Sequence, residues 1–102
     1  MTIEIQNNSG TEIAKAQVWA VGSRASVLLI EQTSLAVGST HRQAIKSDLG
    51  LASDGSYELR LMEAAGNRTF TSGYFTNGSS IYKNISFQVE KDTIVGKIVV
   101  RF

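Results

Sequence analysis

The only histidine of the chain, His41, is the residue on which any serine-hydrolase triad would have to be built. Ser39 would then supply the nucleophile, and Asp48 or Asp54 would orient the imidazole. The spacing of these residues does not support such a triad, and His41 stands beside Arg42 on a polar segment, where a surface histidine is the simpler interpretation. We predict that the protein is not an enzyme, and a small hydrolase centred on His41 is the remote alternative.

Metal ligands are equally scarce, because the chain has one histidine and no cysteine. Only oxygen ligands remain, and the densest group of them is Ser53-Asp54-Gly55-Ser56. This segment holds a single carboxylate, and Asp-Gly is typical of a turn. The nine glycines form no phosphate-binding motif ahead of a helix. The sequence therefore predicts no metal site and no cofactor.

Charge gives no sign of a polyanionic partner. Ten lysines and arginines and nine acidic residues are scattered along the 102 residues. A nucleic-acid-binding protein usually concentrates its basic residues in a patch or stripe. We therefore predict no nucleic-acid partner.

The first residues lack the basic start and the apolar segment of a secretion signal. No apolar stretch approaches the roughly 20 residues that cross a bilayer. We expect a soluble protein without a membrane span. Its compartment is left open: cytoplasmic as written, or exported as a mature form.

Apolar and polar side chains alternate along most of the chain, most clearly from residue 57 to the end. Successive side chains of a β-strand point to opposite faces, so this alternation predicts strands with one buried face. The clearest segments are 57–63, 81–89 and 93–102. The side chains expected in the core from these three segments are Tyr57, Leu59, Leu61, Ile81, Ile85, Phe87, Val89, Ile94, Ile98, Val100 and Phe102.

Further strands are predicted around Ile3 and Ile5 and over residues 13–21, 40–48 and 70–75. The polarity of 40–48 favours an edge position with Ala44 directed inward. Residues 25–36 allow two interpretations, a buried strand or one face of a short helix. We favour the strand, because Val27 and Ile30 are β-branched.

Asn77-Gly78 fits the positive backbone angles of a type I′ turn, with residues 81–89 returning along the preceding strand. Seven or eight short strands at this spacing are typical of an antiparallel sandwich or small barrel. We predict an all-β fold: one antiparallel β-sandwich domain over residues 1–102, with an immunoglobulin-like sandwich or a small barrel as the alternative.

Four aromatic residues are candidates for a ligand or partner surface: Trp19, Tyr74, Phe75 and Tyr82. Flat rings on strand faces or loop tips commonly bind sugars or partner loops. Tyr74 and Phe75 are adjacent, so one of them should point outward, and Tyr82 has the outward parity of its own strand. A place at the edge of the core or in a subunit contact is the competing interpretation.

The last strand places valines where a solvent-facing strand would prefer polar side chains. Val95, Lys97 and Val99 are alternate residues of this strand, so that all three side chains point outward. The two valines are best explained if another protein surface covers this face of the strand. We predict an oligomer interface at Val95 and Val99, most simply in a symmetric dimer. Trp19 and Val21 can extend this surface if they lie on a neighbouring outward face.

The arrangement Ile5-x-Asn7-x-Ser9-Gly10, followed by Leu35-x-x-Gly38 and by Gly55-x-Tyr57-x-Leu59-x-Leu61 with Gly66 after it, resembles small β-sandwich modules found in many uncharacterised bacterial proteins. The shared positions are turn and core residues. The resemblance implies the fold and no particular function, and it carries over no catalytic or binding residue.

These observations favour a non-enzymatic binding or assembly module that associates with itself, with a protein or glycan as a further partner. A small carbohydrate-binding, lectin-like domain that uses the candidate aromatic rings is the alternative.

Overall fold

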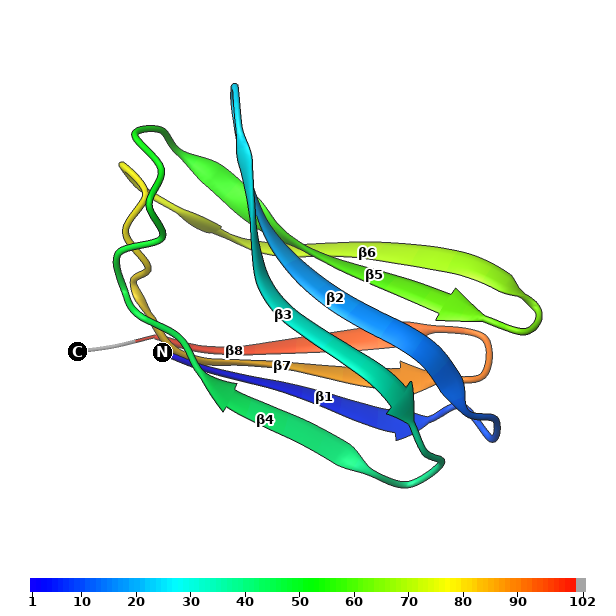
Figure 1. The fold of residues 1–102 in the computed structure, drawn as a ribbon. Helices are drawn as coiled ribbons and strands as arrows, with labels where there is room; N and C mark the ends of the chain where they lie inside the picture. The colour runs from blue at the N-terminus through cyan, green and yellow to red at the C-terminus, as the bar shows by residue number, and fades with distance from the viewer. Residues whose placement is uncertain (101–102) are drawn as a thin grey trace.

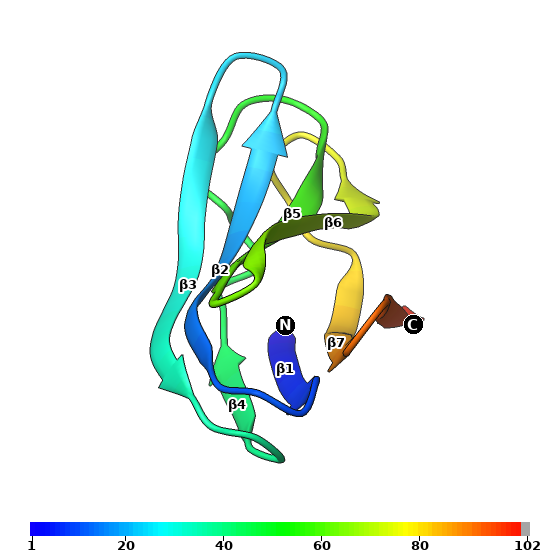
Figure 2. The same cartoon turned by 90° about the vertical axis from the view of Figure 1, so that its right-hand side faces the viewer.

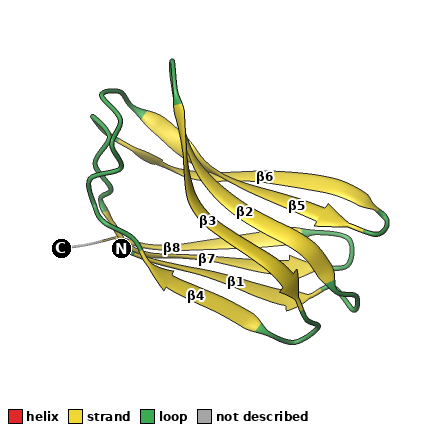
Figure 3. Ribbon diagram, viewed as in Figure 1, coloured by secondary structure: helices red, strands yellow, loops and turns green. Residues whose placement is uncertain are grey.

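The computed structural model describes residues 1–100, and the regular secondary structure there is entirely β-strand (Figures 1 and 3). The strands in chain order are β1 (Thr2–Asn8), β2 (Ile13–Gly22), β3 (Ser26–Leu35), β4 (Thr40–Ala44), β5 (Gly55–Glu63), β6 (Gly66–Phe75), β7 (Tyr82–Glu90) and β8 (Ile94–Val100). No helix in this part of the chain is long and apolar enough to cross a membrane.

The strands form two four-stranded sheets, in the orders β4-β1-β7-β8 and β3-β2-β5-β6. Figure 2 shows β1, β4 and β7 facing the curved layer that contains β3, β2, β5 and β6. The predicted all-β sandwich is confirmed, as two separate sheets.

One strand pair departs from the antiparallel architecture that the sequence predicted. β1 runs parallel to β7, while the other five pairings in the described chain are antiparallel. β1 lies between β7 and β4, and its pairing with β4 is antiparallel.

The core lies between the two sheets and takes the inward-facing side chains of both. Its buried apolar members are Ile3, Ile5, Ile13, Ala16, Val18, Ala20, Ile30, Leu35, Leu49, Tyr57, Leu59, Leu61, Phe75, Tyr82, Ile85, Phe87 and Val89. Burial of one such large side chain stabilises a fold by about 1.5–3 kcal/mol. The ring of Phe70 on β6 meets that of Phe87 on β7 edge-on, with centroids 6.2 Å apart, and so joins the two sheets.

Residues 26–35 form a strand, so the strand interpretation of this segment is confirmed over the helical one. β3 is an edge strand of its sheet, and much of it is exposed. A bulge between Val18 and Trp19 shifts the β2–β3 pairing. As a result Ile30 is buried in the core while Leu28, opposite Trp19, is exposed.

β4 is the polar edge strand that the sequence predicted, but it ends at Ala44. The expected inward direction of Ala44 is wrong. Ala44 lies opposite Thr2, and the next pair is Gln43 with the buried Ile3. Opposite residues share a face and neighbours alternate, so Ala44 points outward.

A buried asparagine ties together the turns at one end of the sandwich. The Asn7 side-chain amide donates to the carbonyl oxygens of Thr11 and Leu35, each at 2.9 Å. Its Oδ1 accepts hydrogen bonds from the Ser9 amide at 3.0 Å and from the Ser9 hydroxyl at 2.6 Å. A fully buried polar side chain needs such partners. These contacts give Asn7 and Ser9 a structural role.

The Asn77-Gly78 turn has positive φ at both central residues, 50° and 69°, as a type I′ turn requires. Thr76 and Ser79 exchange backbone hydrogen bonds across it, at 2.9 and 3.2 Å. The predicted turn is confirmed, but the predicted pairing of its flanking strands is wrong. β6 and β7 belong to different sheets, so the turn carries the chain across the sandwich.

Gly78→Ala is expected to destabilise the fold far more than Gly10→Ala. Both glycines have positive φ, 69° and 86°, which costs a residue with a Cβ about 1–2 kcal/mol. A Cβ at Gly78 would also collide with the backbone carbonyl of Leu51. A Cβ at Gly10 would have no other atom within 4 Å. The free energy of unfolding, measured in urea, should fall by at least about 2 kcal/mol more in Gly78→Ala than in Gly10→Ala. Equal losses would contradict this packing of the turn.

Candidate functional site

The residues of the hypothetical hydrolase are engaged separately. His41 Nε2 lies 3.1 Å from Gln43 Oε1, and the Ser39 hydroxyl donates to the carbonyl oxygen of Ala36 at 2.6 Å. Asp48 accepts a hydrogen bond from the Gly50 amide, and Asp54 accepts one from the Asn77 amide. These carboxylates stabilise turns. The structure thus does not assemble His41, Ser39 and an aspartate into a triad.

Residues 1–100 contain no group of three or more histidine, cysteine or acidic residues that could hold a metal ion. The Ser53–Ser56 segment that offered the most oxygen atoms closes the loop before β5. Its Ser53 carbonyl accepts a hydrogen bond from the Gly78 amide at 2.8 Å. The turn expected at Asp54-Gly55 is wrong, because Gly55 is the first residue of β5 and pairs with Gly22.

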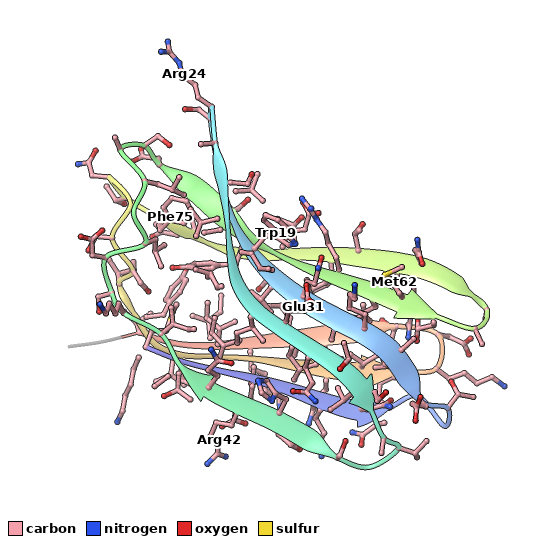
Figure 4. All side chains as sticks on the ribbon, in the orientation of Figure 1. Trp19, Arg24, Glu31, Arg42, Met62 and Phe75 are labelled. Carbon is pink, nitrogen blue, oxygen red and sulfur yellow. The ribbon has the colours of Figure 1, made fainter. Side chains whose placement is uncertain are left out.

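Two of the four candidate aromatics belong to the core. Phe75 and Tyr82 are exposed to 1% and 3% only, and Figure 4 shows Phe75 among the side chains between the sheets. The outward direction expected for Tyr82 is wrong, because a bulge between Tyr82 and Asn84 reverses the alternation set by Ile85. For the same reason Ile81, expected in the core, is exposed.

Tyr74 is the exposed member of the Tyr74-Phe75 pair, with 58% of its surface accessible. Its ring meets that of Tyr82 edge-on at 6.1 Å, and its backbone amide donates to the Tyr82 hydroxyl at 3.0 Å. The expectation that one of the pair points outward is confirmed. Tyr74 therefore lies on the surface directly above the end of the core that contains Tyr82.

Trp19 lies on the outer side of β2 (Figure 4), where an arginine covers its ring. The Arg60 guanidinium is 4.7 Å from the ring centroid and pairs with Glu58 at 2.6 Å. The indole N–H donates to Gln17 Oε1 at 3.0 Å, and Gln17 in turn donates to Glu31. Because Arg60 occupies the ring face and Gln17 the donor, Trp19 is a poor stacking platform for a sugar.

The outer side of β8 carries Val95 and Val99, which are exposed as the sequence predicted. Ile98 and Val100 were expected in the core and are exposed too. Phe102, also expected there, lies outside the described residues. The exposed fractions of the four β8 side chains lie between 38% and 49%. The exposure of Ile98 and Val100 follows from the edge position of β8, which a period-two pattern does not reveal.

The exposed side chains of β8 are continuous with Tyr74. Val100 lies opposite Tyr82, the ring partner of Tyr74. A Cβ built at Gly73 would come within 3.2 Å of Ile98 Cδ1, so β6 and β8 approach each other here. We call Tyr74, Val95, Ile98, Val99 and Val100 the β8 surface. Trp19 and Val21 do not extend it, because β2 belongs to the other sheet.

Two depressions hold charged groups that pair within the chain. A shallow one of about 400 Å³ beside Val99 contains the Arg42–Glu4 ion pair, at 2.8 Å. Another, at the end of the sandwich, contains Arg68, which donates twice to the Glu63 carboxylate at 2.7 Å. These hydrogen bonds raise the pKa of Arg68 above its usual value. Each depression also has a lysine in its lining, Lys83 in the first and Lys91 in the second.

No family model, curated protein or solved structure matches this chain.

Arg60→Ala is expected to expose the ring of Trp19 without changing the fold. An exposed cation–π contact contributes about 0.5–1 kcal/mol, so the free energy of unfolding in urea should fall by no more than that amount. Trp19 is the only tryptophan, and acrylamide should quench its fluorescence more strongly in the variant. Arg42→Ala, which breaks the exposed pair with Glu4 on the other sheet, is the control. Equal quenching in both variants would contradict the covered ring.

Proposed function

We propose that this protein is a non-enzymatic assembly module that associates with a second copy of itself through the β8 surface. The single observation that carries the proposal is the set of exposed apolar side chains on an edge strand, Val95, Ile98, Val99 and Val100. An edge strand presents unpaired backbone N–H and C=O groups, which makes it a template for pairing with another chain.

The other three edge strands are protected in the ways that natural sheets use. β4 is five residues long and polar. The exposed positions of β3 include Glu31, Thr33 and Ser34, and those of β6 include Asn67, Thr69 and Thr71. Short length and polar side chains discourage unwanted pairing. Within the described chain, β8 alone combines an open edge with several exposed branched apolar side chains, and its one charged residue is Lys97.

The outer face of the sheet supports the same conclusion. Val95 lies opposite Gln88 and Val99 opposite Asn84, so the two valines border a row that is otherwise polar. Polar residues would be expected at these positions if the strand faced only water. A subunit contact that ends at β8 explains why the apolar residues stop there.

The carbohydrate-binding alternative has less support. Phe75 and Tyr82 are buried, and Arg60 covers Trp19, which leaves Tyr74 as the one candidate ring open to a ligand. Tyr74 borders β8, where it can contribute equally to a subunit contact. A small hydrolase centred on His41 has no assembled partner groups in its favour.

Replacing Val95 and Val99 together by lysine, beside the existing Lys97, is expected to convert a dimer into a folded monomer. Like charges brought together in an interface cost several kcal/mol, and each 1.4 kcal/mol is tenfold in affinity, so the dissociation constant should rise at least about 100-fold. Size-exclusion chromatography with light scattering measures the mass, and circular dichroism checks the fold.

Leu28→Lys and Val37→Lys are matched controls, because both residues are exposed and apolar and lie away from β8. Both controls should remain dimeric. A wild-type protein that is monomeric at its highest soluble concentration, or a Val95→Lys/Val99→Lys variant that stays dimeric, would refute the proposal.

A further inference from the structure

We infer that two copies join by strand pairing: β8 runs antiparallel to β8 of the partner subunit about a two-fold axis at Ile98. The two four-stranded sheets then become one continuous eight-stranded sheet. This inference rests on the proposed function and specifies its geometry, since self-association by packing of two outer faces would satisfy the proposal equally well.

The backbone of β8 favours pairing over face packing. In an antiparallel ladder alternate residues direct their N–H and C=O groups to one neighbour, so about half of those of β8 point away from β7. β6 does not take up these groups, because it belongs to the other sheet. It packs on the core side of β8 instead: a Cβ at Gly96 would lie 2.9 Å from Phe70 Cε1 and 3.0 Å from Ser72 Oγ.

A second β8 is a strand of matching character. β8 exposes apolar side chains on both of its faces, Val95 and Val99 outward and Ile98 and Val100 on the core side of the edge. The incoming strand must therefore offer apolar side chains on both faces as well. A two-fold contact makes the same surface serve both subunits, and β8 meets that condition.

Lys97 excludes the register with the greatest overlap. β8 spans Ile94–Val100, so pairing about its middle would place Lys97 opposite Lys97 of the partner subunit. Like charges directly opposite on a sheet are destabilising. The two-fold axis must move at least one residue along the strand, to Gly96 or to Ile98.

The distribution of exposed apolar side chains selects Ile98. A Gly96 centre would place Val100 opposite Asp92, a residue of the β7–β8 turn. An Ile98 centre places Ile98 opposite itself and Val99 opposite Lys97 of the partner subunit. It also brings the axis to the end of β8 that lies nearest Tyr74, where Ile98, Val99 and Val100 are exposed together.

Single-cysteine variants test this register, because the chain has no cysteine of its own. Directly opposite residues have Cα atoms about 4.5–5.5 Å apart, inside the range of about 4.4–6.8 Å that a disulfide spans. A residue next to Ile98, such as Val99, lies two positions along the strand from the same residue of the partner subunit. Two residues along a strand add about 6.8 Å to the separation between strands. The Cα atoms of such a pair are then roughly 8 Å apart, beyond the range of a disulfide.

Under mild oxidation Ile98→Cys should form a covalent dimer, while Val95→Cys alone and Val99→Cys alone should not. An equimolar mixture of Lys97→Cys and Val99→Cys should cross-link between the two chains, since these positions face each other. The mixture probes the outer face only, so it remains informative if Ile98→Cys disturbs the core. Leu28→Cys, away from β8, and oxidation of the unfolded variants in urea measure the background of non-specific disulfide formation.

The outcomes separate this inference from the function on which it rests. Monomeric wild-type protein by light scattering would refute the proposed self-association. Dimeric protein in which Val99→Cys cross-links to itself, or in which the mixture fails to cross-link, would leave self-association standing and refute the Ile98 register. Cross-linking of Ile98→Cys and of the mixture, with neither single outer variant linking, is the result we expect.

Discussion

The closing of two sheets over one apolar layer is the constraint on which the rest of the structure depends. Each strand gives alternate side chains to that layer, and the intervening ones face outward. Leu59 and Phe87, from opposite sheets, are both fully buried in it. The apolar layer ends at the edges of the sheets. Apolar side chains of an edge strand that extends past this layer are therefore exposed to solvent. β8 is in that position, and its surface is a direct consequence of the fold.

Alternation predicted the strands well wherever the ladder is unbroken. Tyr57, Leu59 and Leu61 are buried as expected, as are Ile85, Phe87 and Val89. It failed at bulges, where one extra residue reverses the parity of everything beyond it. The bulge between Tyr82 and Asn84 explains why Tyr82 is buried and Ile81 is not. Nothing in the sequence around Lys83 marks this bulge, so the sequence assigned Tyr82 to the wrong side of its strand.

Strand order could not be predicted, because it depends on contacts between distant segments. β1 pairs with β4 and β7, and the latter pairing is parallel. The sequence did locate Val95 and Val99, whose outward parity is unusual for valine. It did not locate Ile98 and Val100, since their exposure depends on β8 being an edge strand. The role of Asn7 was equally hidden, because its partner Leu35 lies 28 residues away.

The central claim is that β8 has an open edge in a single copy and a paired edge in the assembly. Hydrogen–deuterium exchange of its amides, measured at rising protein concentration, tests this most directly. The β8 amides directed away from β7 should become protected as the protein associates, while amides on the open edges of β3 and β4 should keep the same exchange rates. Exchange in β8 that stays equally fast at every concentration, in protein that light scattering shows to be associated, would contradict it.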